Sequence, residues 1–270
     1  MADRNSAIGV FDSGIGGLTA VKELARLLPN ENIVYLGDTA RVPYGTKSRD
    51  TIYKYAAQDV KFLMSHNVKM YIAACGTVSS VLADETDFCG GLYTGVILPT
   101  VDAACKATRN RKIGVIGTAA TIRSKSYERL INERLPECEV YSKACPMFVP
   151  LVENGYIVSD CAPTIEIAKE YLLPLKAAGV DTLILGCTHY PLLEDIIRGI
   201  MGEGVSLVSS GGEAGKYAMR ILAEKGLLSD RKERGKIELY CTDSAELFEE
   251  NAQHFLSGLD NVMIKSCSLD

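Results

Sequence analysis

Short apolar stretches alternate with longer stretches of helical periodicity along this sequence, and the alternation limits the fold more than any other feature. The apolar stretches are rich in Val, Ile, Leu and Tyr, and in the longer stretches apolar residues recur every three or four positions. Alternation of this kind is typical of parallel sheets that helices cover on both faces. The sequence therefore predicts an α/β fold, in which ligands bind beyond the carboxyl ends of the strands.

The pattern also places the clearer elements along the chain. We expect strands at residues 7–11, 33–36, 70–74, 95–98, 112–116, 139–142, 182–185, 205–208 and 237–241. We expect helices at residues 18–28, 50–65, 164–178 and 213–225.

A repeated segment indicates two similar halves. Residues 68–77 (VKMYIAACGT) resemble residues 180–189 (VDTLILGCTH), and in both a cysteine lies seven residues after the valine that begins the strand. A weaker repeat pairs the IGV of residues 8–10 with that of residues 113–115. We therefore expect two similar Rossmann-like, doubly wound parallel-sheet domains related by pseudo-two-fold symmetry, with the active site between them. The first domain would comprise residues 1–98 plus 207–270, and the second residues 99–206.

Charge and composition exclude several classes of function. The chain has 34 acidic and 29 basic residues, and the basic residues form no cluster, so nucleic acid is not an expected partner. No apolar run reaches the roughly 18 residues that a membrane-spanning helix requires, and residues 1–6 contain no signal-peptide core. We expect a cytoplasmic protein that does not bind membranes.

Nine cysteines in a reducing compartment are thiols by default. No CxxC motif occurs, and the histidines at positions 66, 189 and 254 are too far apart for a local zinc motif, so no metal is expected. A single buried cysteine is best interpreted as a small apolar residue. This interpretation is given to Cys89, Cys105, Cys138, Cys145, Cys161, Cys241 and Cys267.

Cys75 and Cys187 differ because they occupy matching positions in the repeat, each expected where a strand ends and a helix begins. A helix N-terminus stabilises a thiolate and lowers the thiol pKa from about 8.5 towards neutrality. Two thiols facing each other across a cleft suit two-base proton transfer, in which one thiolate removes a proton and the opposite thiol donates another. Disulfide redox chemistry is the other possibility, but it usually needs a CxxC motif.

Asp12 and His189 are candidates to assist these thiols. Asp12 ends a strand that enters the glycine-rich turn FDSGIGG, and His189 lies two residues after Cys187. Each also has an ordinary alternative, as a helix-capping aspartate and as a structural histidine. The turn matches the dinucleotide-binding pattern GxGxxG only in part, so no nucleotide cofactor is expected.

Four segments together resemble the signature sequences of bacterial glutamate racemases. They are FDSGIGGL at residues 11–18, GDTARVPYG at 37–45, ACGT at 74–77 and LGCTHYP at 185–191. The resemblance extends over nearly the whole chain and implies cofactor-independent interconversion of L- and D-glutamate, without PLP or metal. It further implies two α/β domains, a homodimer, and the supply of D-glutamate for peptidoglycan.

The resemblance also implies roles for individual residues. Cys75 would remove the α-proton of D-glutamate and Cys187 that of L-glutamate, with Asp12 and His189 assisting respectively. Glu153 would lie near the cleft. The residues expected around the substrate are Asp12, Ser13, Pro43, Tyr44, Gly45, Gly76, Thr77, Thr118, Thr121, Thr188 and His189.

One position departs from the family pattern. The residue after the first cysteine is usually asparagine, and here it is Gly76. The loss of a side-chain hydrogen bond to the substrate would cost about 1–3 kcal/mol. If the space is vacant, Gly76→Asn should raise kcat/KM; glycine is otherwise needed where the backbone has a positive φ.

Two alternatives remain open. An aspartate or hydantoin racemase of the same superfamily would also use paired cysteines, although the DSGIGG and PYG segments favour glutamate. A binding or regulatory protein on this scaffold, such as one that restrains DNA gyrase, would not require both cysteines.

Overall fold

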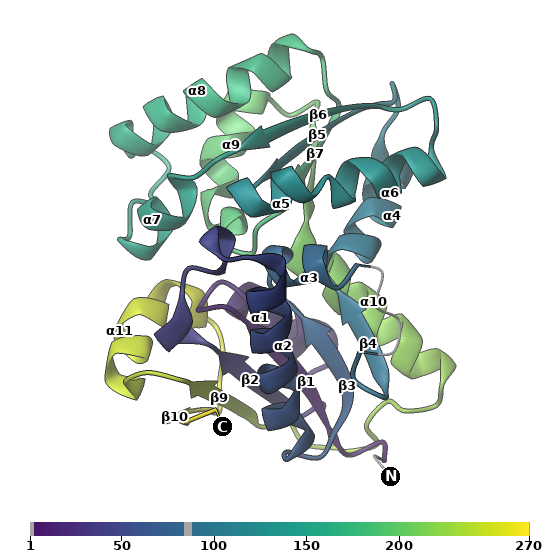
Figure 1. Cartoon of the computed structure of the whole chain (residues 1–270), viewed down its shortest axis with the longest axis vertical. Helices are drawn as coiled ribbons and strands as arrows, with labels where there is room; N and C mark the ends of the chain where they lie inside the picture. The colour runs from purple at the N-terminus through teal and green to yellow at the C-terminus, as the bar shows by residue number, and fades with distance from the viewer. Residues whose placement is uncertain (1–2, 84–87, 270) are drawn as a thin grey trace.

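The computed structural model describes residues 3–83 and 88–269, and these form two lobes, one above the other in Figure 1. The described residues build a six-stranded sheet in the order β10-β9-β2-β1-β3-β4 and a four-stranded sheet in the order β6-β5-β7-β8. Neighbouring strands in both sheets run parallel. The predicted fold class, with two parallel sheets, is confirmed.

The strands of each sheet come from separate parts of the chain. The six-stranded sheet contains β1 (Ala7–Asp12), β2 (Ile33–Gly37), β3 (Val68–Ala73), β4 (Leu92–Gly95), β9 (Ile237–Cys241) and β10 (Val262–Ser266). The four-stranded sheet contains β5 (Lys112–Gly117), β6 (Glu139–Ala144), β7 (Thr182–Leu185) and β8 (Ser206–Ser209).

Helices connect and cover these strands. The α-helices are α1 (Leu18–Leu27), α2 (Arg49–Met64), α3 (Gly76–Val81), α4 (Ile97–Ala107), α5 (Ala119–Ser124), α6 (Ser126–Arg134), α7 (Phe148–Glu153), α8 (Ala162–Ala177), α9 (Glu194–Met201), α10 (Ser210–Glu224) and α11 (Ala245–Leu256). The 3-10 helices are η1 (Thr39–Arg41), η2 (Tyr44–Thr46) and η3 (Tyr190–Leu193). Among the described residues, none of these helices has the length and apolar character needed to cross a membrane.

The sequence repeat corresponds to a repeated strand order. In the larger sheet four strands follow the order β2-β1-β3-β4, and the smaller sheet has the same arrangement as β6-β5-β7-β8. The two repeated segments therefore lie at equivalent strands, β1 with β5 and β3 with β7. The larger sheet differs by two further strands, β9 and β10, which extend its β2 edge.

One predicted strand was wrong. Residues 95–98 overlap β4 only at Gly95, and the apolar residues that follow belong to helix α4. A short apolar run cannot be assigned to a strand or a buried helix from periodicity alone. Pro99 lies in the first turn of α4, where proline is tolerated because its missing N–H would have no helical partner.

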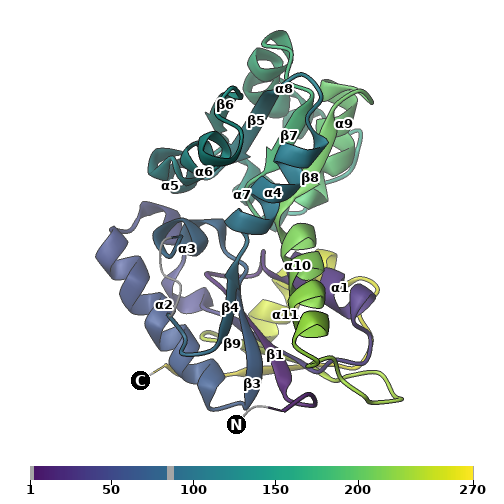
Figure 2. The same cartoon turned by 90° about the vertical axis from the view of Figure 1, so that its right-hand side faces the viewer.

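The chain passes between the lobes twice, once through α4 and once where β8 continues directly into α10 (Figure 2). The expected boundaries at residues 98/99 and 206/207 therefore fall inside α4 and β8. We propose that the two lobes are two domains joined at these connections. The larger domain is then formed from both ends of the chain.

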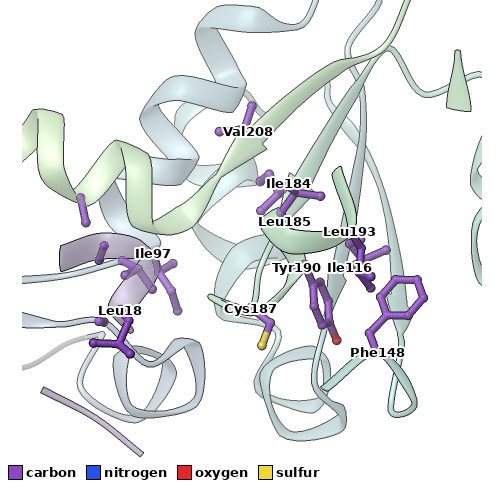
Figure 3. Close-up of a cluster of buried hydrophobic side chains, with 14 of the residues drawn as sticks. Leu18, Ile97, Ile116, Phe148, Ile184, Leu185, Cys187, Tyr190, Leu193 and Val208 are labelled. Carbon is purple, nitrogen blue, oxygen red and sulfur yellow. The ribbon is translucent and has the colours of Figure 1, made fainter. Parts of the chain in front are cut away.

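Apolar packing behind the strand ends positions the site. In the smaller lobe, Ile116 and Leu185 of neighbouring strands are fully buried, and Tyr190 lies close to Cys187 beside Phe148 (Figure 3). The rings of Phe148 and Tyr190 meet edge to face with centroids 5.1 Å apart. Burying each such side chain contributes about 1.5–3 kcal/mol, so the turn that carries Cys187 rests on a rigid base.

Candidate active site

A cavity of about 440 Å³ lies between the two lobes, at the carboxyl ends of strands from both sheets. Its lining includes residues that end or follow β1, β3, β5, β6 and β7. This is where ligands bind in parallel α/β sheets. Every residue that the sequence placed in the site lines it: Asp12, Ser13, Pro43, Tyr44, Gly45, Cys75, Gly76, Thr77, Thr118, Thr121, Glu153, Cys187, Thr188 and His189.

Cys75 is held at the boundary between β3 and α3. It is the N-cap residue of α3, it is buried, and its Sγ lies 3.5 Å from the Ser13 Oγ, to which it donates. Asp12, at the end of the neighbouring strand β1, accepts a 2.6 Å hydrogen bond from the backbone N–H of Gly17. This hydrogen bond ties the Asp12 carboxylate to the glycine-rich turn.

The expected low pKa of the first thiol is wrong. Burial, followed by the negative charge of Asp12, raises the pKa of the Cys75 thiol to about 12. Removing a thiolate from water disfavours the charged form, and a nearby carboxylate disfavours it further. Hydrogen bonds from Ser13 and from the backbone of Val78 in α3 lower the pKa, but they do not offset these two effects. Cys75 is therefore a thiol at neutral pH.

Cys187 has a different environment, dominated by His189. The Nδ1 atom of His189 lies 3.8 Å from the Cys187 Sγ, and its Nε2 lies 3.0 Å from the Glu153 Oε1. Burial alone would lower the pKa of His189, but the contacts with Cys187 and Glu153 outweigh it and raise the pKa to about 10. The imidazole is thus a cation at neutral pH, directly beside the second thiol.

Cys187 does not begin a helix, contrary to expectation. Gly186, Cys187, Thr188 and His189 form a turn, and the 3-10 helix η3 begins only at Tyr190, before α9. The turn is fixed at both sides, because Gly186 N–H donates to the Ile116 carbonyl at 2.8 Å and Tyr190 N–H donates to the Cys187 carbonyl at 3.1 Å.

Hydroxyl groups from both lobes meet in the cavity. The Oγ1 atoms of Thr77 and Thr118 lie 3.3 Å apart, and those of Thr118 and Thr121 lie 3.0 Å apart. Thr77 belongs to α3, whereas Thr118 and Thr121 belong to the start of α5. These groups can both donate and accept hydrogen bonds, so they suit a ligand with carboxylate oxygens.

Tyr44 reaches the cavity from η2, while its hydroxyl points into a buried acidic cluster. The hydroxyl donates to Asp38 and lies 3.4 Å from the Asp59 Oδ2. Arg41 contacts the same two carboxylates, at 2.5 Å to Asp38 and 3.3 Å to Asp59. The cluster therefore holds the Pro43–Tyr44–Gly45 segment from behind.

The space at Gly76 is occupied rather than vacant. A Cβ atom on Gly76 would lie 2.6 Å from the carbonyl oxygen of Gly186. Gly76 also does not have a positive φ. Both sequence-based explanations of this glycine are therefore replaced by a third: it lets the backbone of one lobe approach the backbone of the other.

Several lining residues were not predicted. Cys145, interpreted from the sequence as a structural thiol, is fully buried yet contributes to the cavity wall together with Pro146, Val149 and Pro150. Burial raises the pKa of the Cys145 thiol to about 12. Cys145 could have been found from its position in the sequence, because it directly follows β6 at the carboxyl edge of the sheet.

No metal centre accompanies the thiols in the part of the chain that the structure describes: no group of three or more His, Cys, Asp or Glu residues there is placed to hold an ion. The cavity combines three free thiols, those of Cys75, Cys145 and Cys187, with one imidazolium, carboxylates and hydroxyls. Each of the thiols, carboxylates and the imidazole can take up and release protons.

Two parallel-sheet lobes with a thiol at equivalent strand ends, enclosing one cavity, define a two-domain α/β protein with a paired-cysteine site. Residues 8–216 match the family described as Asp/Glu/Hydantoin racemase. The chain belongs to this family of racemases.

Individual relatives cover almost the whole chain. A glutamate racemase from Chlorobaculum tepidum is 44% identical over 254 residues, which is 93% of each chain. The crystal structure of glutamate racemase isoform RacE1 from Bacillus anthracis matches with a TM-score of 0.92 and 39% identity, over 98% of both chains. That of the Francisella tularensis glutamate racemase in complex with D-glutamate has a TM-score of 0.89 and 40% identity, over 99% of both chains.

Proposed function

We propose that this protein interconverts L- and D-glutamate by proton transfer between Cys75 and Cys187, without a cofactor. The observation that carries the proposal is that two thiols from equivalent strand ends line a single cavity. The 44% identity to the glutamate racemase of Chlorobaculum tepidum supports the choice of substrate. Two bases from two similar lobes suit a substrate whose two forms are mirror images.

The proton moves in two steps. The Cys187 thiolate removes the α-proton of L-glutamate, so the Cα–H bond breaks and its electron pair remains on the substrate. The Cys75 thiol then donates its proton to the opposite face of Cα, which gives D-glutamate and leaves Cys75 as the thiolate. The reverse reaction begins with the Cys75 thiolate and D-glutamate.

The groups beside the two thiols differ. The cationic His189 lies beside Cys187, whereas burial and Asp12 keep Cys75 protonated. Before it can remove the proton of D-glutamate, Cys75 must lose its own. Asp12 is the group placed to assist at Cys75.

The cavity recognises the substrate through neutral donors and a single cation. Among its described lining residues there is no lysine or arginine. We infer that hydroxyls such as those of Ser13 and Thr77 bind the carboxylates, with His189 supplying positive charge, and that Asp12 attracts the ammonium group. The apolar wall at Val149 and Pro150 would contact the methylene groups of the substrate.

Circular dichroism of L-glutamate mixed with the purified protein tests the proposal. Without any added cofactor, and with EDTA present, the signal should decay to zero as the mixture becomes racemic. Cys75→Ser and Cys187→Ser should each abolish this decay, while Cys267→Ser, outside the cavity, should not. Decay with L-aspartate but not L-glutamate would identify an aspartate racemase. No decay with either would favour a regulatory role.

A substrate analogue with a β-leaving group separates the two bases, because elimination needs only one of them. The Cys75→Ser protein, which retains Cys187, should eliminate from the L form. The Cys187→Ser protein should eliminate from the D form. Near wild-type racemisation of glutamate by both variants would contradict the assignment.

Two further expectations follow from the resemblance and stay predictions. The D-glutamate produced would serve peptidoglycan synthesis, and the protein would be a homodimer. Depletion of the protein should cause a growth defect that D-glutamate in the medium relieves. Sedimentation velocity at micromolar concentration measures the assembly state.

A further inference from the structure

Two glycines of the larger lobe contact the turn that carries Cys187. Gly76 directly follows Cys75, and Gly16 lies in the turn between β1 and α1. A Cβ atom on Gly76 would lie 2.6 Å from the Gly186 carbonyl oxygen, and one on Gly16 would lie 2.6 Å from the Thr188 Oγ1 and closer still to the His189 ring. Non-bonded carbon contacts are favourable only at about 3.5–4.0 Å, so neither position has space for a side chain.

Both glycines are required by space and not by backbone conformation. The glycines with a positive φ among the described residues are Gly90, Gly155, Gly179, Gly202, Gly226 and Gly258. Gly16 and Gly76 are absent from this set, so an alanine could adopt their backbone angles. An alanine at either position would instead force the larger lobe and the Cys187 turn apart.

The Cys187 turn cannot retreat from this contact. A Cβ atom on Gly186 would lie 2.7 Å from the Ile116 carbonyl oxygen, so the turn rests directly on β5. On the other side, the Thr19 hydroxyl of α1 donates a 2.9 Å hydrogen bond to the Thr188 carbonyl. Gly76 therefore contacts the turn just before Cys187, and Gly16 and Thr19 contact it just after.

We propose that Gly16 and Gly76 are positioning residues: they seat the Cys187 turn against the larger lobe and so set the distance between Cys187 and Cys75. The inference rests on the proposed two-base reaction. A proton reaches Cα from each side only if both sulfurs lie within reach of it, and a displacement of 1 Å can reduce the rate by about a hundredfold. Gly76 lies next to Cys75 in the sequence, but the residue whose position its contact with Gly186 sets is Cys187.

Gly76→Ala tests this directly, with Gly199→Ala as the matched control. Gly199 is also helical, in α9, and a Cβ atom there has no neighbour within 4 Å. We expect Gly76→Ala to lower kcat by about tenfold to a hundredfold, with KM changed by less than about threefold. Gly199→Ala should leave both constants unchanged and raise the melting temperature, because alanine favours a helix.

The substrate deuterium isotope effect on kcat/KM identifies which thiol is displaced. If proton transfer at Cys187 becomes slower, α-deuterated L-glutamate should show a larger isotope effect, because removal of its α-proton by Cys187 becomes rate-limiting. α-Deuterated D-glutamate should show a smaller isotope effect. Removal of its α-proton by Cys75 then becomes reversible, because the later proton transfer from Cys187 is the slow step. Equal effects in both directions, or an increased KM with unchanged kcat, would overturn the positioning role.

Thr19→Val gives a second route that adds no atom to the contact. It removes the hydroxyl that lies 2.9 Å from both the Thr188 carbonyl and the Gly16 carbonyl, and should shift the isotope effects in the same two directions with a smaller loss of kcat. An unchanged isotope pattern in this variant would also overturn the proposal.

Failure of the reaction itself would be distinguishable. If the wild-type protein does not racemise glutamate, the two-base function is wrong, and the melting temperatures still decide the contact. Gly76→Ala should then melt below wild type and Gly199→Ala above it. A Gly76→Ala protein as stable as Gly199→Ala would show that the two lobes do not meet at this glycine.

Discussion

His189 carries the charge that distinguishes the two halves of the site. Cys75 and Cys187 follow equivalent strands, yet one lies beside a carboxylate and the other beside an imidazolium. A symmetric fold thus holds an asymmetric pair of thiols. In the two-base reaction that we propose, one thiol acts as the base while the other acts as the acid at every turnover.

The protonated His189 should make the stability of the fold depend on pH. Its pKa is about 10 when folded and about 6.5 when unfolded. Below about 6.5 both states hold the proton, so the stabilisation is fully present, and it is lost as the pH rises towards 10. We expect the wild-type melting temperature to fall over this interval, and the fall to be smaller in His189→Gln.

Glu153→Gln provides the control for this dependence. The Glu153 carboxylate helps to raise the pKa of His189. Removing this carboxylate should therefore shift the fall in melting temperature to lower pH without abolishing it. Identical pH dependence in wild type and His189→Gln would mean that His189 is not a buried cation.

At the scale of elements, helix α2 supports the loop that brings Tyr44 to the cavity. Asp59 of α2 is fully buried beside Asp38, and the two carboxylates share one cation, Arg41. Burial, followed by the charge of Asp38, raises the pKa of Asp59 well above its ordinary range. The folded protein therefore favours the protonated form of Asp59, which can act as a hydrogen-bond donor.

Asp59→Asn should accordingly be tolerated, because asparagine has the same shape and no charge. Since the folded state keeps a proton that the unfolded state releases, wild-type stability should fall as the pH rises above the ordinary carboxyl range. Asp59→Asn should show less of this fall and be at least as stable at neutral pH. Chemical denaturation at several pH values measures both effects.

Asp59→Leu is the contrasting variant. It removes one partner of Tyr44 and one of Arg41, while their contacts with Asp38 remain, and should lower the free energy of unfolding by about 1–3 kcal/mol. KM for glutamate should rise, because the Pro43–Tyr44–Gly45 segment loses its support. If Asp59→Asn were as damaging as Asp59→Leu, the carboxyl group would be ionised and paired instead.

The elements that sequence reasoning located are those with an unambiguous local signal. Strand β1 is buried at every position and contains no charged residue before Asp12, and its predicted position was right to within one residue. Strand β10 was missed because it is an edge strand with mixed burial. Helix α11 was also missed, although Ser244, which accepts a hydrogen bond from Leu247 N–H, is a readable helix start.

The gathering of the site was predictable, but its electrostatics were not. Cys75 and Cys187 could be selected because they end repeated strands, and carboxyl ends of parallel strands meet at one edge. The raised pKa of Cys75 depends on burial by residues far away in the sequence. The reason for Gly76 depends likewise on Gly186, in the other lobe. Neither effect has a local pattern.

At the scale of the whole molecule, the two ends of the larger sheet have separate tasks. Residues at the carboxyl ends of β1 and β3 line the cavity, whereas residues near the amino ends of β2 and β3 form a buried ion pair. Lys69, near the start of β3, lies 2.5 Å from Glu31 and donates to the backbone carbonyls of Arg4 and Leu227. Glu31 also accepts a hydrogen bond from Ser229 N–H at 2.8 Å. This cluster joins four separate parts of the chain.

Lys69→Met should therefore destabilise the fold without impairing the site. It leaves the Glu31 carboxylate buried without a cation, which costs about 3–5 kcal/mol, and adding Glu31→Gln should recover part of that loss. Lys265→Met is the matched control, because the Lys265–Glu238 pair is partly exposed and such pairs contribute about 0–1 kcal/mol.

Well below the melting temperature, kcat/KM of Lys69→Met should equal that of wild type, since Cys75 follows the opposite end of β3. Stability is measured by urea denaturation and activity by circular dichroism. A lowered kcat/KM in a protein that is still fully folded would mean that the two ends of the sheet are coupled.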